Sequence, residues 1–204
     1  MFKIGLTGGI CTGKTFILNI FKELDCYTIK ADEIAKNIIF SNKPEIVTEI
    51  VKVFGESVLD QKNGIKKDEF TRMLFEDTEK RNFVNNFIHP LVKAEKNNIL
   101  NDLEKSKVYD FFIYESALLV ESGTYKDFDK IIIVYTSQEE QIKRLMNRDG
   151  FSQEEAETRL KSQFPLSEKL KVAHYTIDTT GTFENSRAKT LETFHLIKKD
   201  LNFL

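Results

Sequence analysis

The sequence predicts an α/β fold in which a parallel five-stranded sheet is covered by helices on both faces. Two observations predict it. Short apolar segments alternate along the chain with longer segments whose apolar residues have helical spacing. The first apolar segment also leads through a glycine-rich turn directly into a helical pattern. Such alternation is typical of β-α-β units, whose strands run parallel.

The opening thirty residues form one predicted β-α-β unit. Residues 2–6 are apolar and bounded by glycine, as in a buried parallel strand. Residues 15–24 then carry apolar side chains at helical spacing, and a second short strand is expected at 27–29.

Helices are expected to predominate from Glu33 to about Ile99, in a region inserted into the sheet. The pattern favours helices at 33–40, 44–54, 67–75, 79–87 and 90–100. Pro90 is expected to open the last of these, because proline is favoured in a first helical turn. Residues 60–64 resemble a calcium loop but lack the EF-hand spacing, so a tight turn is expected there.

The second half of the chain is expected to return to the sheet. Ser137 can cap a helix that runs to Arg148, and Ser152-Gln153-Glu154-Glu155 is a capping-box pattern that opens another helix, carrying Arg159 and Gln163. The remaining elements are strands at 108–114, 130–135 and 175–177 and a closing helix at 184–199.

Composition excludes several classes of protein. Lysine and arginine total 30 against 32 acidic residues, and the net charge of -2 provides no general attraction to nucleic acid or to an anionic membrane. No apolar run reaches membrane-spanning length and no leader precedes the first strand, so we expect a cytoplasmic protein. Cys11 and Cys26 form no disulfide framework, and the three histidines show no zinc-site spacing.

The segment Gly8-Gly9-Ile10-Cys11-Thr12-Gly13-Lys14-Thr15, here called the phosphate loop, fits the Walker A pattern. In this pattern the glycines let backbone N–H groups surround phosphate, the lysine neutralises charge and the threonine contacts Mg²⁺. The loop lies between a predicted strand and a predicted helix, where the pattern must occur. We therefore expect the chain to bind the phosphates of a nucleoside triphosphate, with Mg²⁺.

Asp32 and three arginines are the other candidates for the site. Asp32 follows the second strand, so it should emerge at the sheet edge that carries the phosphate loop. Spacing alone leaves two roles open for it, a base that activates a hydroxyl or the N-cap of the next helix. Arg144, Arg148 and Arg159 either neutralise a transferring phosphoryl group or are solvated surface residues.

Several segments, taken in order, resemble the dephospho-coenzyme A kinase family over nearly the whole chain. They are Ile4-Gly5-Leu6-Thr7-Gly8-Gly9-Ile10 with Gly13-Lys14-Thr15, Ala31-Asp32-Glu33-Ile34-Ala35, Ile88-His89-Pro90-Leu91-Val92, Leu118-Leu119-Val120-Glu121, Arg144-Leu145-Met146-Asn147-Arg148-Asp149-Gly150, and Ala173 through Asp178 followed by Gly181.

The resemblance implies a P-loop NTPase fold of three α/β/α layers, forming one kinase domain over residues 1–204. It also implies a helical acceptor-binding region at 33–100 and a helical lid at 145–170. The implied reaction is phosphorylation of the ribose 3′-hydroxyl of dephospho-coenzyme A by ATP, with Mg²⁺, to give coenzyme A and ADP.

Carried onto this chain, the resemblance makes Lys14, Asp32 and Arg148 the catalytic residues, with Asp32 as the base and Arg148 in the lid. Thr15 would coordinate Mg²⁺. Candidates for the acceptor pocket are Lys67, Arg72 and His89. The residues implied to bind ATP are Gly9, Cys11, Thr12, Gly13, Lys14, Thr15 and Phe16.

The chain departs from the family pattern at five positions. Cys11 replaces a glycine of the loop, and Phe16 replaces a small hydroxyl residue; both can act through backbone N–H groups. Lys30 stands where an aspartate is common, and an ammonium close to Asp32 would weaken that residue as a base. The other two departures are Ala117 in place of proline and Thr179 in place of an asparagine near the adenine site.

Two rivals follow from the same motifs. Another small-molecule kinase, acting on a nucleoside, a nucleotide or shikimate, would carry the same phosphate loop. A GTP-binding switch protein is also suggested by Asp178-Thr179-Thr180-Gly181, which spells D-x-x-G. The Asn-Lys-x-Asp motif that reads guanine should follow this element and does not, which disfavours the switch.

Overall fold

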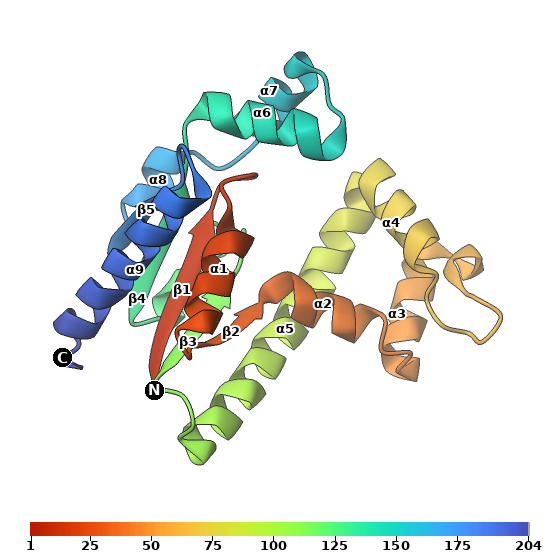
Figure 1. The fold of residues 1–204 in the computed structure, drawn as a ribbon. Coiled ribbons are helices and arrows are strands. Elements are labelled where there is room, and N and C mark those ends of the chain that lie inside the picture. Colours follow the sequence, from red (N-terminus) through yellow and green to blue (C-terminus); the bar gives the residue numbers. More distant parts are fainter. Residues whose placement is uncertain (204) are drawn as a thin grey trace. The chain divides into compact units, whose positions relative to one another are not determined.

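The computed structural model describes residues 1–203, and the chain forms two compact units. The α/β unit is built from Met1–Ile29 and from the chain from Lys107 onward. The helical unit is Lys30–Ser106, which runs from orange to green in Figure 1. None of the helices among residues 1–203 has the length and apolar content needed to cross a membrane.

A five-stranded sheet with the order β2-β3-β1-β4-β5 forms the centre of the α/β unit. β1 lies between β3 and β4 and is parallel to both, and β4 is parallel to β5. This confirms the predicted α/β fold with a parallel sheet. The strands are β1 (Phe2–Gly8), β2 (Tyr27–Lys30), β3 (Phe111–Glu115), β4 (Lys130–Tyr135) and β5 (Tyr175–Asp178).

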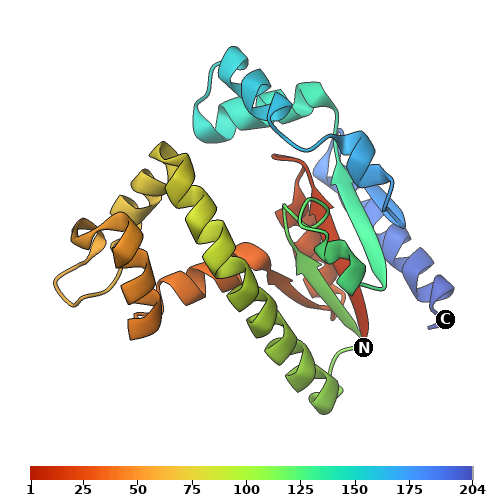
Figure 2. The same cartoon turned by 180° about the vertical axis from the view of Figure 1, so that it is seen from behind.

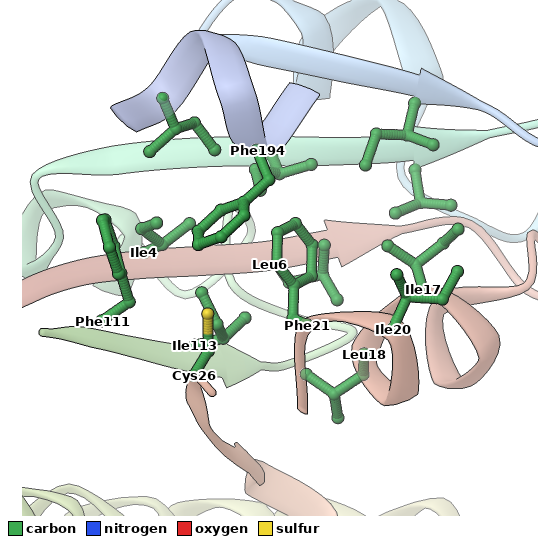
Figure 3. Close-up of a cluster of buried hydrophobic side chains, with 14 residues drawn as sticks. Ile4, Leu6, Ile17, Leu18, Ile20, Phe21, Cys26, Phe111, Ile113 and Phe194 are labelled. Atoms are coloured by element: carbon green, nitrogen blue, oxygen red, sulfur yellow. The ribbon is translucent and has the colours of Figure 1, made fainter. Parts of the chain in front are cut away.

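One face of the sheet packs against α1 (Lys14–Glu23) and α9 (Phe183–Asp200), which also contact each other. Ile4 and Leu6 of β1 lie beneath Phe21 of α1 and Phe194 of α9, whose rings meet edge to face 5.8 Å apart (Figure 3). Because side chains alternate along a strand, Ile4 and Leu6, which are two positions apart, point to the same face of the sheet.

The opposite face is covered by the segment between β3 and β4, which includes η2 (Thr124–Asp127) and lies against the sheet in Figure 2. Gly5 makes this packing possible. A Cβ on Gly5 would lie 2.6 Å from a methyl group of Leu119 and 2.9 Å from one of Ile131. Only a residue without a side chain allows this close approach. A short helix, α8 (Leu166–Leu170), contacts β4.

Two further helices, α6 (Gln138–Asp149) and α7 (Gln153–Lys161), pack together in the α/β unit (Figure 1). Both predicted N-caps are confirmed. The Ser137 hydroxyl accepts a hydrogen bond from the Glu140 N–H, and Ser152 forms a complete capping box with Glu155. Gly150 ends α6 in the left-handed conformation that favours glycine.

The helical unit packs around its own aromatic and aliphatic core. Phe70 stacks on Phe54 at 4.8 Å and meets Phe40 edge to face at 5.9 Å. The predicted tight turn at 60–64 is confirmed, since the Asp60 carboxylate accepts hydrogen bonds from the Lys62 and Gly64 N–H groups. The elements are α2 (Ala31–Ile39), α3 (Pro44–Phe54), η1 (Glu56–Val58), α4 (Lys67–Glu76) and α5 (Thr78–Ser106).

The prediction of separate helices at 79–87 and 90–100 is wrong, because α5 is one continuous helix with Pro90 in its interior. Proline removes one helical hydrogen bond and usually kinks or breaks a helix. Here a buried row continues through it at four-residue spacing, formed by Val84, Ile88, Val92, Lys96 and Leu100. Burial along this row outweighs the local cost of the proline.

Candidate active site

The phosphate loop connects the carboxyl end of β1 to the start of α1, as the sequence predicted (Figure 1). Gly8 pairs with Val134, so the loop emerges at the edge where β4 also ends. Gly13 precedes the first residue of α1 in the left-handed conformation, with φ of 84°. A glycine N-cap offers no side chain to the first N–H groups of the helix, which suits anion binding.

Lys14 and Thr12 stabilise the loop from within. The Lys14 ammonium donates hydrogen bonds to the carbonyl oxygens of Gly8 and Gly9, at 3.2 and 2.8 Å. The buried Thr12 hydroxyl donates to the same Gly9 oxygen at 3.0 Å. Thr15 lies exposed in the first turn of α1. The Lys14 side chain therefore folds back over the phosphate loop and contacts its backbone.

Cys11 occupies a position where the family usually has glycine, and its φ of 55° is left-handed. A residue with a Cβ pays an energetic cost in this conformation. Burial raises the pKa of the Cys11 thiol, although the charges of Arg148, Lys14 and Arg144 oppose the shift. The side chain is therefore a neutral thiol at pH 7.

Arg144 and Thr179 bind the loop from other elements. Arg144, on α6, donates to the Cys11 carbonyl at 3.3 Å and to the Thr179 carbonyl at 2.8 Å. The Thr179 hydroxyl, just after β5, donates to the Thr12 carbonyl at 2.8 Å. Sequence reasoning gave Arg144 only a possible charge role and named Thr179 as a departure near the adenine site. No pattern in the sequence predicts that Arg144 and Thr179 contact the loop backbone.

Two glutamines also reach the loop, and both were missed as site residues. Gln141 donates its side-chain N–H to the Ile10 carbonyl at 2.8 Å. The Ile10 N–H donates to the side-chain oxygen of Gln163 at 3.0 Å. Gln163 was expected within a helix but lies two residues beyond the end of α7. A capping box marks the start of α7, and no comparable signal marks its end.

Arg148 lies near the end of α6 and is more than half exposed. Its guanidinium makes two hydrogen bonds to the carboxylate of the neighbouring Asp149, at 2.8 and 2.7 Å. This pairing raises the pKa of Arg148 and lowers that of Asp149. Burial raises the pKa of the Cys11 thiol, and the positive charge of Arg148 opposes that rise.

Phe16 packs its ring against Phe183 at the start of α9, with ring centroids 5.0 Å apart. Phe183 is 71% exposed. The aromatic side chain that replaces a small hydroxyl residue in the family pattern therefore has a partner outside the loop.

Asp32 is the second residue of α2 and is exposed. The alternative that it caps a helix starting at Glu33 is wrong, because α2 begins at Ala31 and its N-cap is Lys30. The Lys30 ammonium forms an ion pair with Glu33 at 3.2 Å. The positive charge of Lys30 is therefore paired with Glu33 rather than with Asp32.

The acceptor candidates Lys67, Arg72 and His89 all lie in the helical unit and are exposed. Arg72 lines a surface hollow of about 440 Å³ between the end of α4 and the start of α5. Its guanidinium is paired with Glu69 and Glu76 on the same helix, at 2.6 and 2.8 Å.

Ala117, the remaining departure from the family pattern, is exposed and belongs to a polar cluster around the buried Lys169 in the α/β unit. Its carbonyl accepts a hydrogen bond from the ammonium of Lys169, whose side chain is only 3% exposed. The same ammonium forms an ion pair with Glu121 at 2.5 Å. This cluster ties α8 to the segment that follows β3.

The family model for dephospho-CoA kinase matches residues 2–185 of the chain. The dephospho-CoA kinase of Aquifex aeolicus is 34% identical over 98% of this chain and 100% of its own length. The corresponding protein of Carboxydothermus hydrogenoformans is 36% identical over 92% of this chain and 90% of its own length. The solved structure of dephospho-CoA kinase from Campylobacter jejuni superposes with a TM-score of 0.68, at 29% identity and 97% coverage of both chains.

Proposed function

Because the chain belongs to the dephospho-CoA kinase family, we propose that it catalyses the last step of coenzyme A biosynthesis. In this reaction the γ-phosphoryl group of ATP is transferred to the 3′-hydroxyl of dephospho-coenzyme A, giving coenzyme A and ADP. The observation that carries the proposal is a complete phosphate loop at the sheet edge of a chain that matches the family over nearly its full length.

The phosphate loop would bind ATP through the residues expected from the sequence: Gly9, Cys11, Thr12, Gly13, Lys14, Thr15 and Phe16. The N-terminus of α1 has no side-chain cap, and this supports the role, because helix N–H groups and the helix dipole favour phosphate. Lys14 would leave the Gly8 and Gly9 carbonyls and neutralise charge on the transferring group.

The residues present also fit Mg²⁺. Where a protein binds Mg²⁺ together with a nucleotide, it usually supplies only one or two oxygen ligands. Phosphate oxygens and water molecules complete the coordination shell. The exposed hydroxyl of Thr15, in the first turn of α1, is suited to be such a ligand. The ion would supply charge stabilisation for the transferring phosphoryl group.

Asp32 is proposed as the base that accepts the proton of the acceptor hydroxyl. Its exposure and the pairing of Lys30 with Glu33 support this role, because the carboxylate is accessible to a substrate. Arg148 is proposed to contact phosphate after exchanging its Asp149 partner, which is exposed and adjacent in sequence.

Residues 33–100 are proposed as the acceptor-binding region and residues 145–170 as the lid, within one kinase domain. We propose a cytoplasmic location.

A coupled assay of ADP release tests the proposal. Dephospho-coenzyme A is the acceptor, and the position of the new phosphate is determined on the product. We expect turnover with dephospho-coenzyme A and phosphate on the 3′-oxygen. Preferential turnover of shikimate, a nucleoside or a nucleoside monophosphate would reject this acceptor. Competition between ATP and GTP tests the remaining rival, since a GTP-binding switch would prefer GTP.

A further inference from the structure

We propose that Gln163 is a positioning residue, whose side-chain oxygen holds the first half of the phosphate loop in its binding conformation. Gln163 lies within the proposed lid, residues 145–170, but the proposed function gives its side chain no role. The inference rests on three features: a pair of hydrogen bonds to Ile10, the close approach permitted by Gly9, and the anchoring of the segment that carries Gln163.

The first feature is that two side-chain amides hold Ile10 on its two sides. The Ile10 N–H donates to Gln163 at 3.0 Å, and the Ile10 carbonyl accepts from Gln141 at 2.8 Å. Both glutamines are more than 130 positions away in sequence. With both of its polar backbone groups bound, Ile10 has a defined orientation, and the left-handed Cys11 follows directly.

The second feature is the space that Gly9 leaves beside the two amides. Gly9 has no left-handed φ, so its backbone conformation does not require glycine. A Cβ there would lie 2.8 Å from the amide nitrogen of Gln141 and 3.2 Å from the side-chain oxygen of Gln163. Because Gly9 has no side chain, both amides have room to reach Ile10.

The third feature is that Gln163 is held in place from both directions along the chain. Its N–H donates to the Leu160 carbonyl in the last turn of α7. Two residues later Pro165 precedes α8, in which the buried Lys169 forms an ion pair with Glu121. A side chain on such an anchored segment loses less conformational freedom when it forms its hydrogen bond.

Together these features make Gln163 the link between the loop and the segment that follows α7. Without its oxygen, the Ile10 N–H would lose its partner and the loop would populate other conformations. ATP would then have to select the competent fraction, which weakens apparent binding without changing the chemical step. A lost hydrogen bond of this kind corresponds to an increase of about 3–10-fold in the KM for ATP.

The experiment compares Gln163→Ala with Gln153→Ala, a matched control. Gln153 is an exposed glutamine of α7 whose amide contacts Glu157 and not the loop. Two measurements are made: hydrogen exchange of the Ile10 amide by NMR in the nucleotide-free protein, and KM values for both substrates. Leu6, in the centre of β1, is the internal reference for exchange.

For Gln163→Ala we expect faster exchange at Ile10, unchanged exchange at Leu6 and a raised KM for ATP. The kcat and the KM for the acceptor should change by less than about 3-fold. Gln163→Glu keeps an acceptor oxygen of the same reach, so it should restore slow exchange at Ile10. The control should match the wild type in every measurement.

Unchanged exchange at Ile10 in Gln163→Ala would overturn the proposal, as would an equal effect of Gln153→Ala. If Gln163→Ala does not fold, Gln163→Met decides the question, because it preserves length and volume while removing the amide oxygen. The exchange measurement needs no catalytic activity, so a failure of the proposed kinase reaction would be recognised separately.

Discussion

The two compact units of this protein organise their polar groups differently. In the α/β unit, the loop carbonyls of Ile10, Cys11 and Thr12 are bound by Gln141, Arg144 and Thr179, which lie 131, 133 and 167 positions away. In the helical unit, the side chains of Arg72 and Lys52 instead pair within their own helices, Arg72 with Glu69 and Glu76 and Lys52 with Glu49.

The difference shows which parts of the molecule are preorganised. Contacts between distant segments form only when the whole unit is folded, so the phosphate loop takes its conformation from the tertiary structure. Exposed pairs within one helix contribute little to stability and exchange partners readily. The phosphate loop is therefore preorganised for the proposed binding of ATP phosphates, and the charges of the proposed acceptor region remain able to pair with a substrate.

The strongest test of this comparison is Lys14→Ala. Lys14 is the one loop side chain proposed to act on phosphate directly, so we expect turnover to fall by about 10³-fold or more. The stability of the α/β unit should change little, because the Lys14 ammonium donates to the Gly8 and Gly9 carbonyls of its own loop. Lys22→Ala, in the last turn of the same helix, is the control. Normal turnover of Lys14→Ala would remove the loop from its proposed role.

In the helical unit, the largest expected effect is that of Asp32→Asn. Removal of a general base typically costs about 10²–10⁴-fold in turnover. We expect this loss in kcat. The Kd for ATP, measured by calorimetry, should be unchanged. Glu45→Gln alters an exposed carboxylate in the first turn of α3 and should have a much smaller effect. A fully active Asp32→Asn variant would refute the assignment of Asp32 as the base.

The ion pair between the buried Lys169 and the partly exposed Glu121 should respond asymmetrically to substitution. Glu121→Gln leaves the buried Lys169 ammonium without its carboxylate, so we expect a loss of about 3 kcal/mol in the free energy of unfolding. Lys169→Met removes the buried charge itself and leaves a carboxylate that is 23% exposed, so the loss should be smaller. Urea denaturation measures both, and equal losses would contradict the argument.

A gain in stability is expected at Cys11. Cys11→Gly relieves the left-handed strain but increases the flexibility of the unfolded chain, and the net gain should be about 0.5–1 kcal/mol. Cys11→Ala keeps the strain while removing the thiol, and it serves as the control. If both variants have the same melting temperature, backbone strain at residue 11 is not significant.

The smallest expected effect on stability is that of Arg72→Gln in the helical unit. Because Arg72 is exposed and pairs only within α4, its loss should leave the melting temperature unchanged. If Arg72 binds the acceptor, the KM for dephospho-coenzyme A should rise while the KM for ATP stays the same. Lys52→Gln removes a similar exposed pair with Glu49 on α3 and should change neither value.

Local patterns in the sequence predicted much of the fold. The strands, the turn at Asp60 and the helix starts at Ser137 and Ser152 depend on a few adjacent residues, and each was recognised. The prediction failed where local and long-range terms compete. Pro90 has the local properties of a helix start, yet a buried row running past it keeps α5 continuous.

The sequence by itself determined the α/β class, the phosphate loop and the candidate residues Lys14, Asp32 and Arg148, because each is encoded within a short segment or in a segment typical of the family. Only the tertiary structure decided the strand order and the partners of the loop. The contacts of Gln141, Gln163 and Thr179 join positions more than 130 residues apart. No local pattern encodes such contacts, since they form only when the sheet and its helices bring the segments together.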